Sequence, residues 1–214
     1  MKAITVATAG LAATAATADA ATLSLDSVRA CYLSGTQATI SGSGFAAGAP
    51  IEVTEDGEAR GSTVADTSGA FAATWNFGGL NAAKSHTITA TDGATAASVT
   101  YMGTTYRVAT RKSKGRAGRK YKLRGYGFLF GRKAFMHVRG HGVRRDVFLA
   151  RPKAPCGTFT VKQRIAPAGS PFGDYKVQFD AKKKYSKKTP NALHFTLNVF
   201  PRASAAAAGW TLAR

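Results

Sequence analysis

Apolar and polar residues alternate in short runs along most of this chain, and the same glycine-rich turn interrupts the runs twice. The first turn spans 42–48 (GSGFAAG) and the second spans 125–131 (GYGFLFG), each between two alternating runs. Alternation with a period of two predicts β-strands, and glycine supplies the positive φ that a tight turn needs. We therefore expect strand, turn and strand at both places, with Phe45 and Phe128 packed back onto the sheet.

The two turns belong to a longer repeat. Gly44 and Gly127 are 83 residues apart, and two further segments recur in the same order at a similar spacing. They are 68–74 (SGAFAAT) with 156–162 (CGTFTVK), and 86–91 (HTITAT) with 175–180 (YKVQFD). Three ordered matches indicate a tandem duplication in which each repeat is one domain.

Each repeat accommodates seven short strands, and no segment has the 3.6-residue apolar period of a long helix. The predicted fold class is therefore all-β. Seven strands with turns between them, in roughly 80 to 100 residues, favour an immunoglobulin-like β-sandwich. The strands are expected at 22–26, 37–42, 50–55, 59–65, 69–77, 84–91 and 95–101, and again at 105–110, 119–125, 133–140, 143–149, 156–165, 173–180 and 192–200.

The resulting organisation is two tandem sandwich domains, 21–101 and 102–202, between an N-terminal segment and an Ala-rich tail, 203–214. Residues 1–20 are expected to be a cleavable signal peptide, because Lys2 precedes an uncharged run that ends in the small-x-small pattern Ala18-Asp19-Ala20. The alternative is an Ala/Thr-rich leader with no export function. No later window reaches the ~20 apolar residues of a spanning helix. We expect a secreted or cell-surface protein, located outside the cytoplasm.

The motif GSGFAAGAP at 42–50, followed by an alternating strand and the turn DTSGAF at 66–71, resembles the immunoglobulin-like repeats of secreted or cell-surface bacterial proteins. The IPT/TIG group is the nearest named set. The likeness covers the first repeat along its length, whereas the second keeps the turn but carries basic residues at most surface positions. The antibody-type Cys…Trp…Cys spacing is absent. The resemblance implies a sandwich fold and a spacer, adhesin or carbohydrate-associated role, and it leaves the biochemical function open.

The charge of the chain is divided between the repeats. The whole chain has a net charge of +19; residues 21–101 hold three basic and seven acidic residues, a net of −4, and residues 102–214 hold 26 basic and three acidic residues, a net of +23. Solubility needs a net charge of only a few units, and strong self-repulsion lowers stability. We therefore expect the basic repeat to bind a polyanion. The alternative is that its charge only keeps the protein soluble.

Alternation places five of these cations on one face. In 120–124 (KYKLR) and 158–165 (TFTVKQRI) the apolar side chains point inward and the basic ones point to solvent. The second and fifth strands of an immunoglobulin-like sandwich are neighbours in one sheet. The predicted polyanion site therefore combines a strand face with two basic loops: Lys120, Lys122, Arg124, Lys162 and Arg164 from the strands, and Arg111, Lys112, Lys114, Arg116, Lys182, Lys183, Lys184, Lys187 and Lys188 from the loops.

The expected partner is an anionic polysaccharide or another envelope polymer. Anionic lipid surfaces and extracellular nucleic acid, bound non-specifically, are further candidates. Binding of this kind is salt-sensitive and weakly selective, and the chain has no nucleic-acid recognition motif. The runner-up is an acidic protein partner, such as the first repeat of another copy. A membrane-active toxin would need an amphipathic or apolar insertion element, and the sequence has none.

The chain has two cysteines, Cys31 and Cys156, one in each repeat. Cys31 lies between the first two predicted strands of the first repeat, and Cys156 opens the fifth strand of the second. Because successive strands run in opposite directions, both positions fall at the junction between the repeats. We expect a Cys31–Cys156 disulfide there, a bond that persists in oxidising compartments. Free thiols and an intermolecular bond are the alternatives.

No catalytic, metal or cofactor site is expected. His137 and His141 lie on a strand that leads into a turn, with no third ligand nearby. The turn at Gly44 has a strand on both sides, whereas a nucleophile elbow or a dinucleotide-binding turn needs a helix after it. The carboxylates at the hairpin tip 55–58 are expected to be solvated. The sequence thus predicts an exported, non-catalytic binding protein whose first domain is a spacer or presenter.

Overall fold

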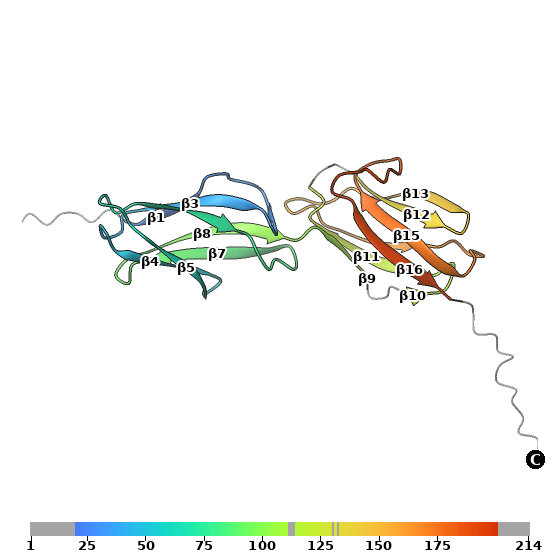
Figure 1. The fold of residues 1–214 in the computed structure, drawn as a ribbon, viewed down its shortest axis with the longest axis horizontal. Coiled ribbons are helices and arrows are strands. Elements are labelled where there is room, and N and C mark those ends of the chain that lie inside the picture. Colours follow the sequence, from blue (N-terminus) through green and yellow to red (C-terminus); the bar gives the residue numbers. More distant parts are fainter. Residues whose placement is uncertain (1–19, 111–113, 130, 132, 201–214) are drawn as a thin grey trace, which may run out of the picture.

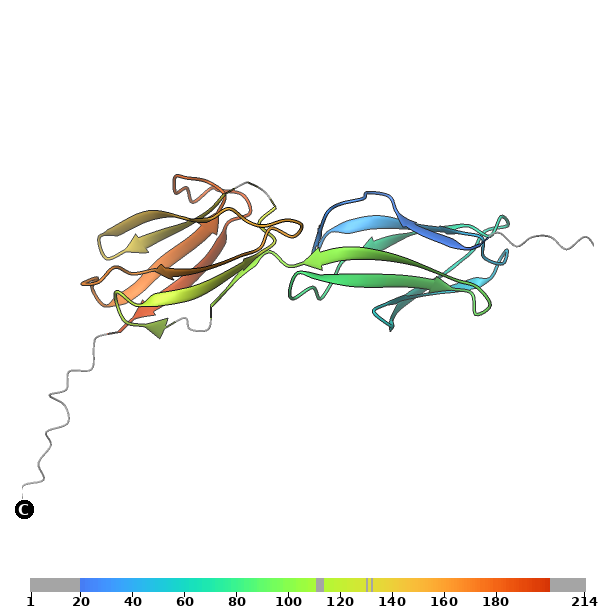
Figure 2. The same ribbon diagram turned by 180° about the vertical axis from the view of Figure 1, so that it is seen from behind.

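Two β-sandwiches lie end to end in a computed structural model of the protein (Figure 1). The structure describes residues 20–110, 114–129, 131 and 133–200. The same arrangement is seen from behind in Figure 2. All regular structure in the described residues is β-strand, so the predicted all-β class is confirmed. Within those residues, no helix is long and apolar enough to cross a membrane.

The first sandwich contains strands β1 to β8. Its smaller sheet has the order β1-β3-β6, and its larger sheet has the order β2-β8-β7-β4-β5. The strands are β1 (Thr22–Leu25), β2 (Tyr32–Leu33), β3 (Gln37–Ser43), β4 (Pro50–Glu55), β5 (Glu58–Val64), β6 (Phe71–Asn76), β7 (Lys84–Thr91) and β8 (Ala96–Thr104).

The second sandwich repeats this topology strand for strand. Its sheets have the orders β9-β11-β14 and β10-β16-β15-β12-β13, which agrees with a tandem duplication. Thr105 and Tyr106 connect the two sandwiches. The strands are β9 (Arg107–Thr110), β10 (Lys114–Gly115), β11 (Lys120–Tyr126), β12 (Ala134–Gly140), β13 (Val143–Ala150), β14 (Phe159–Arg164), β15 (Gly173–Asp180) and β16 (Leu193–Val199).

All fourteen strands expected from alternation are present, with ends that differ by a few residues. The structure adds β2 and β10, which the sequence did not predict. Each contains two residues and pairs in parallel with the last strand of its own domain, Tyr32 with Gly103 and Lys114 with Asn198. Two residues are too few to show an alternating pattern.

The repeated glycine turn has the same role in both domains. In the second, Gly127 has a φ of +73°, and the N–H of Phe128 donates to the carbonyl of Gly157 at 3.1 Å. The Phe128 ring is buried with its centroid 5.0 Å from that of Phe159. The turn therefore joins two recurring segments of the repeat, and the predicted inward packing of the Phe is confirmed. The first domain makes the same contacts with Gly44, Phe45, Gly69 and Phe71.

A disulfide joins the two sandwiches, as predicted. Cys31 and Cys156 are both buried, with Cα atoms 5.2 Å apart. The N–H of Gly127 donates to the carbonyl of Cys156 at 3.0 Å, so the bond attaches the first domain to the segment that holds the glycine turn of the second. Leu33 packs close to this turn as well, because a Cβ on Gly127 would lie 2.9 Å from the Leu33 side chain.

Candidate anion-binding surfaces

Strands β11 and β14 present five cations on the outer face of the smaller sheet of the second domain. The antiparallel register sets Lys120 opposite Arg164 and Lys122 opposite Lys162, and Arg124 follows on β11. All five side chains are exposed, and the residues between them on β11 are buried. The predicted pairing of these two strands is confirmed. We call this surface, made of Lys120, Lys122, Arg124, Lys162 and Arg164, the β11–β14 face.

No carboxylate offsets this charge locally. Strands β9, β11 and β14 contain no Asp or Glu, and among the described residues none of the five cations forms an ion pair. Strand geometry spaces outward residues by about 6.8 Å along a strand and about 4.8 Å across to the next one. Like charges directly opposite each other are destabilising. The β11–β14 face is therefore a small grid of uncompensated positive charge.

Strand β9 extends this face with a residue pair that the sequence analysis missed. Arg107 lies opposite Tyr126 in the register, and its guanidinium stacks over the Tyr126 ring at 5.1 Å from the centroid. The same alternation rule, applied to β9, would have found it.

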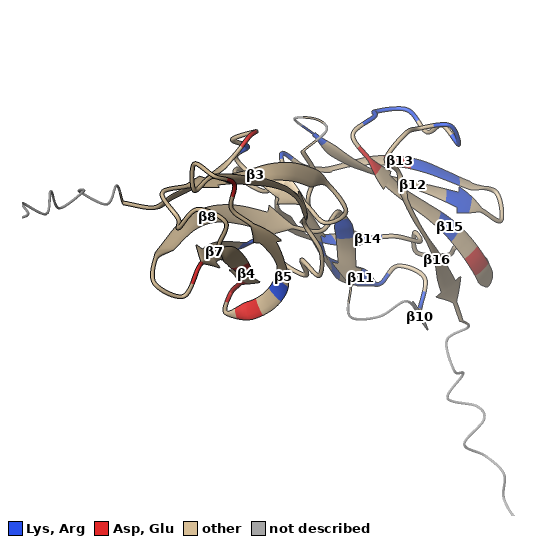
Figure 3. Ribbon diagram, turned by 60° about the vertical axis from the view of Figure 1, so that its left-hand side comes forward, with Lys and Arg blue, Asp and Glu red and all other residues tan. Residues whose placement is uncertain are grey.

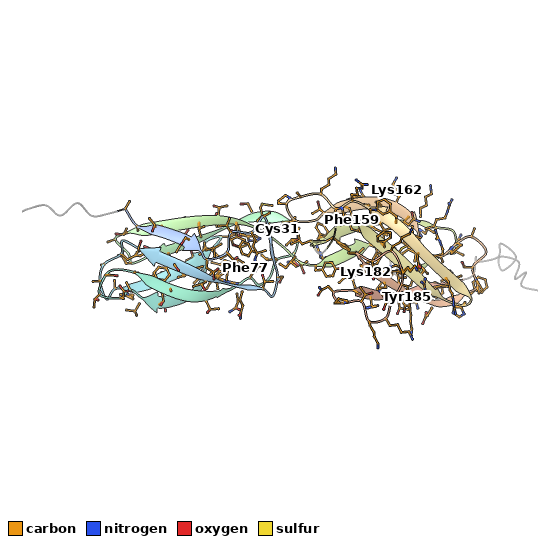
Figure 4. All side chains as sticks on the ribbon, turned by 90° about the horizontal axis from the view of Figure 1, so that it is seen from above. Cys31, Phe77, Phe159, Lys162, Lys182 and Tyr185 are labelled. Atoms are coloured by element: carbon orange, nitrogen blue, oxygen red, sulfur yellow. A yellow bond between two sulfur atoms is a disulfide. The ribbon has the colours of Figure 1, made fainter. Side chains whose placement is uncertain are left out.

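The structure does not bring all fourteen predicted cations together. Lys114 lies on β10 in the larger sheet and Arg116 lies in the turn after it, while Arg111 and Lys112 lie outside the described residues. The remaining five are exposed in the β15–β16 loop, 181–192. Figure 4 shows Lys182 and Tyr185 of this loop on the side of the domain opposite Lys162. The loop cations are Lys182, Lys183, Lys184, Lys187 and Lys188.

A buried polar cluster holds the β15–β16 loop against the larger sheet. His137 is fully buried, with Nδ1 2.8 Å from Asp146 and Nε2 3.2 Å from Asp180. Gln178 donates to a backbone carbonyl of the loop at 3.1 Å, and the N–H of Lys182 donates to Asp180 at 2.7 Å. The five lysines therefore extend from an anchored loop.

Arg139 and Tyr185 complete the anchor. The guanidinium of Arg139 lies 2.5 Å from Asp146 and stacks over the Tyr185 ring at 4.3 Å from its centroid. Burial raises the pKa of Asp146, but hydrogen bonds from His137 and Arg139 outweigh it and hold this pKa below its ordinary value. The carboxylate is therefore ionised at neutral pH. In the described part of the chain, no group of three or more His, Cys, Asp or Glu could hold a metal ion.

The first domain carries neutral side chains where the second has the β11–β14 face. In its register Gln37 lies opposite Asn76 and Thr39 opposite Thr74, with Ser41 next on β3. The amide of Gln37 donates to Asn76 at 2.7 Å. Figure 3 shows the resulting division, with Lys and Arg concentrated on the second domain. Each of the five cations thus has a neutral counterpart in the first domain.

The first domain contains two ion pairs between Lys or Arg and a carboxylate. Asp56 lies 3.1 Å from Lys84, and a backbone hydrogen bond from β7 together with that lysine lowers the pKa of Asp56 to about 2. Glu55 lies 3.2 Å from Arg60 and accepts a hydrogen bond from Tyr101. The expectation that the carboxylates of the 55–58 tip are solvated is wrong for Glu55, because these two partners bury it.

Comparison with known proteins assigns no family and no function to this chain. No protein-family model matches the chain, and no curated protein matches it. Among solved structures it is similar to red sea bream transglutaminase (12% identity, TM-score 0.32, covering 84% of this chain and 31% of that one). It is also similar to the α2-macroglobulins of Escherichia coli (10% identity, TM-score 0.40, 83% and 18% covered) and Salmonella (12% identity, TM-score 0.39, 83% and 16% covered). The chain spans less than a third of each of these proteins. At such identities and TM-scores they lend no function to this chain, and the immunoglobulin-like assignment rests on its own strand order.

Proposed function

We propose that the chain is an exported, non-catalytic protein that binds an anionic polymer of the cell envelope or extracellular matrix through its β11–β14 face. The observation that supports this best is two pairs of opposed cations, Lys120 with Arg164 and Lys122 with Lys162, on strands without a carboxylate. Such an arrangement is unfavourable in the free protein and becomes favourable once a polyanion neutralises it. The first domain then acts as a spacer or presenter.

The chemistry of the face favours a polymer with regularly spaced charges. Exposed Lys and Arg side chains recognise the charge and spacing of an anion, so polymers that carry phosphate or uronate groups fit. Because the interaction is electrostatic, the affinity falls as the salt concentration rises. The interaction is the sum of several weak contacts, each about 1 kcal/mol for basic residues at an anionic surface. Five such contacts correspond to about three to four orders of magnitude in affinity.

Two features support the proposed location and ancestry. The buried Cys31–Cys156 bond belongs to the class of disulfides that persist in oxidising compartments. The proposed signal peptide falls on residues 1–20, of which 1–19 lie outside the described residues.

We further propose that the two domains are IPT/TIG-like repeats, an assignment supported by their shared glycine turn and strand order.

An acidic protein is the second candidate partner. The net charge of −4 in the first domain favours docking of the β11–β14 face on the first domain of another copy. That interaction would saturate at a fixed ratio and would make the protein self-associate as its concentration rises. Binding of several unrelated polyanions without self-association supports the polymer instead.

The decisive test replaces the five cations with the residues that occupy the same positions in the first domain. The variant combines Lys120→Gln, Lys122→Thr, Arg124→Ser, Lys162→Thr and Arg164→Asn in the full chain. These residues are already accommodated by the same sheet in the sister domain, so the fold is expected to persist. Retention on purified cell envelope and on heparin is then measured across a salt gradient.

We expect the wild-type protein to elute only at high salt and the variant to elute near physiological salt. The slope of log K against log salt should shrink by about 0.7 per removed contact, or about 3.5 in total. A matched control removes five cations elsewhere, at Lys182, Lys183, Lys184, Lys187 and Lys188, and should keep most of the retention. Equal losses in both variants would mean that net charge, and not the β11–β14 face, determines binding.

A further inference from the structure

The second domain has a separate cationic cleft on the side opposite the β11–β14 face. It lies between the larger sheet and the anchored loop 181–192 and has a volume of about 610 Å³. We propose that this cleft binds a single organic phosphomonoester, of the size of a glycerol phosphate or sugar phosphate. The inference goes beyond polymer binding, because it concerns one small ligand at another surface. The cationic residues that line the cleft are Arg139, Arg144, Lys176 and Lys187.

Three of these cations form a row across neighbouring strands. Arg139 on β12 lies opposite Arg144 on β13 and opposite Lys176 on β15. Side chains directly opposite each other on one face of a sheet are close enough to interact, and like charges there are destabilising. Lys187 of the loop adds a fourth positive charge to the lining. An anion placed in the cleft would offset the charges of Arg144, Lys176 and Lys187, which form no ion pair among the described residues.

One member of the row is already neutralised and fixed in place. Arg139 pairs with Asp146 and also donates to the backbone carbonyls of Val138 at 2.9 Å and Arg145 at 2.8 Å. With the Tyr185 ring stacked on it, this guanidinium is part of the cleft wall. Its donors are committed to protein acceptors, so the ligand charge must be met by the other three cations.

The charges other than that of Arg139 determine which class of anion fits the cleft. Arg144, Lys176 and Lys187 face one lining carboxylate, Asp174, whose side chain accepts a hydrogen bond from Asn198. Three cations against one carboxylate leave a net charge of +2. A phosphomonoester carries a charge of about −1.5 to −2 at pH 7, whereas a carboxylate or a phosphodiester carries one negative charge. The cleft therefore matches a phosphomonoester best.

The shape of the cleft leaves room for an organic group. Its volume lies in the range of small-molecule sites, roughly 300–1,000 Å³. Gly140 and Gly142 line it as well, and a Cβ on Gly142 would meet nothing within 4 Å. The part of the ligand that carries no charge can extend over Gly142. Because the polar cluster around His137 already holds the loop, binding does not have to order it.

The test is calorimetric titration of the full chain with glycerol 3-phosphate. We expect saturable one-to-one binding, at least tenfold weaker binding of glycerate and dimethyl phosphate, and no binding of glycerol. Lys176→Gln and Arg144→Gln should each weaken binding of glycerol 3-phosphate at least tenfold. Amide shifts in an NMR titration should appear at 139–144, 174–176 and 185–187.

Several outcomes would overturn the proposal. One is absence of saturation, and another is binding that Lys176→Gln and Arg144→Gln leave unchanged. Equal affinity for inorganic phosphate would reduce the cleft to a site for the free ion. Lys122→Thr, on the β11–β14 face, is the matched control and should leave the titration unchanged. The variants Lys176→Gln and Arg144→Gln keep the β11–β14 face, and the variant that neutralises the β11–β14 face keeps the cleft. Failure of one proposal is therefore distinguishable from failure of the other.

Discussion

The two domains share one strand order but differ at the same five outer positions. Where the first domain has Gln37 bonded to Asn76, the second sets Lys120 against Arg164. The neutral pair is compatible with a purely structural sheet, and the charged pair costs stability in the free protein. The comparison teaches that this face of the fold does not require charge. The fold itself therefore does not account for the presence of the five cations.

The strongest way to test this comparison is to transfer the face. Installing Gln37→Lys, Thr39→Lys, Ser41→Arg, Thr74→Lys and Asn76→Arg in a chain that carries the five neutral replacements in its second domain should restore retention on heparin. The gain is expected to be about three to four orders of magnitude in affinity, because each of the five basic contacts contributes about 1 kcal/mol. If the transferred face stays inactive, something other than these five side chains is needed.

A smaller effect is expected where the domains differ in loop length. The β7–β8 connection spans 92–95, whereas the β15–β16 connection spans 181–192 and rests on His137. His137→Ala removes one hydrogen-bond partner of the buried Asp180 and should lower the free energy of unfolding of the second domain by about 1–3 kcal/mol. Hydrogen exchange in the full chain would measure this separately for each domain.

The matched control for this change is Thr54→Ala, 83 residues earlier on β4. It should change the stability of the first domain by no more than about 0.5 kcal/mol. Unchanged protection of β12, β15 and the loop in the His137 variant would contradict an anchoring role for the cluster.

The smallest effect concerns the repulsion itself. Lys122→Thr removes one member of the Lys122/Lys162 pair and should stabilise the second domain by about 0.2–1 kcal/mol at low salt. The gain should vanish near 1 M salt, where charges are screened within about 3 Å. Thr39→Lys, which faces the neutral Thr74, should cost little at any salt concentration. Destabilisation by Lys122→Thr at low salt would show that the opposed lysines do not repel each other in the folded protein.

Sequence reasoning succeeded where a pattern is local or repeats. Alternation located the fourteen longer strands, and the known neighbours of the sandwich fold paired β11 with β14. The disulfide followed from strand direction, from the single cysteine in each repeat and from the expected export of the chain. The same logic also contained a signal for the row Arg144, Arg139 and Lys176, since alternation points all three outward on neighbouring strands.

The anchored loop could not be predicted in this way. Its cluster joins β12, β13 and β15 with side chains that alternation assigns to solvent, yet His137, Gln178 and Asp180 are buried. They are buried because loop 181–192 folds over them, and no local sequence pattern predicts this long-range contact. The sequence therefore showed the five loop lysines as a run of charge but did not predict where the loop lies on the domain.

The bond between Cys31 and Cys156 closes a ring that includes most of both domains and the connection between them. A protease that cuts the backbone once anywhere within this ring, even at Thr105 or Tyr106, leaves the two pieces covalently attached. The two domains would therefore stay covalently linked after a single cut of the backbone within the ring. Those two pieces would separate only after the bond between Cys31 and Cys156 is reduced as well.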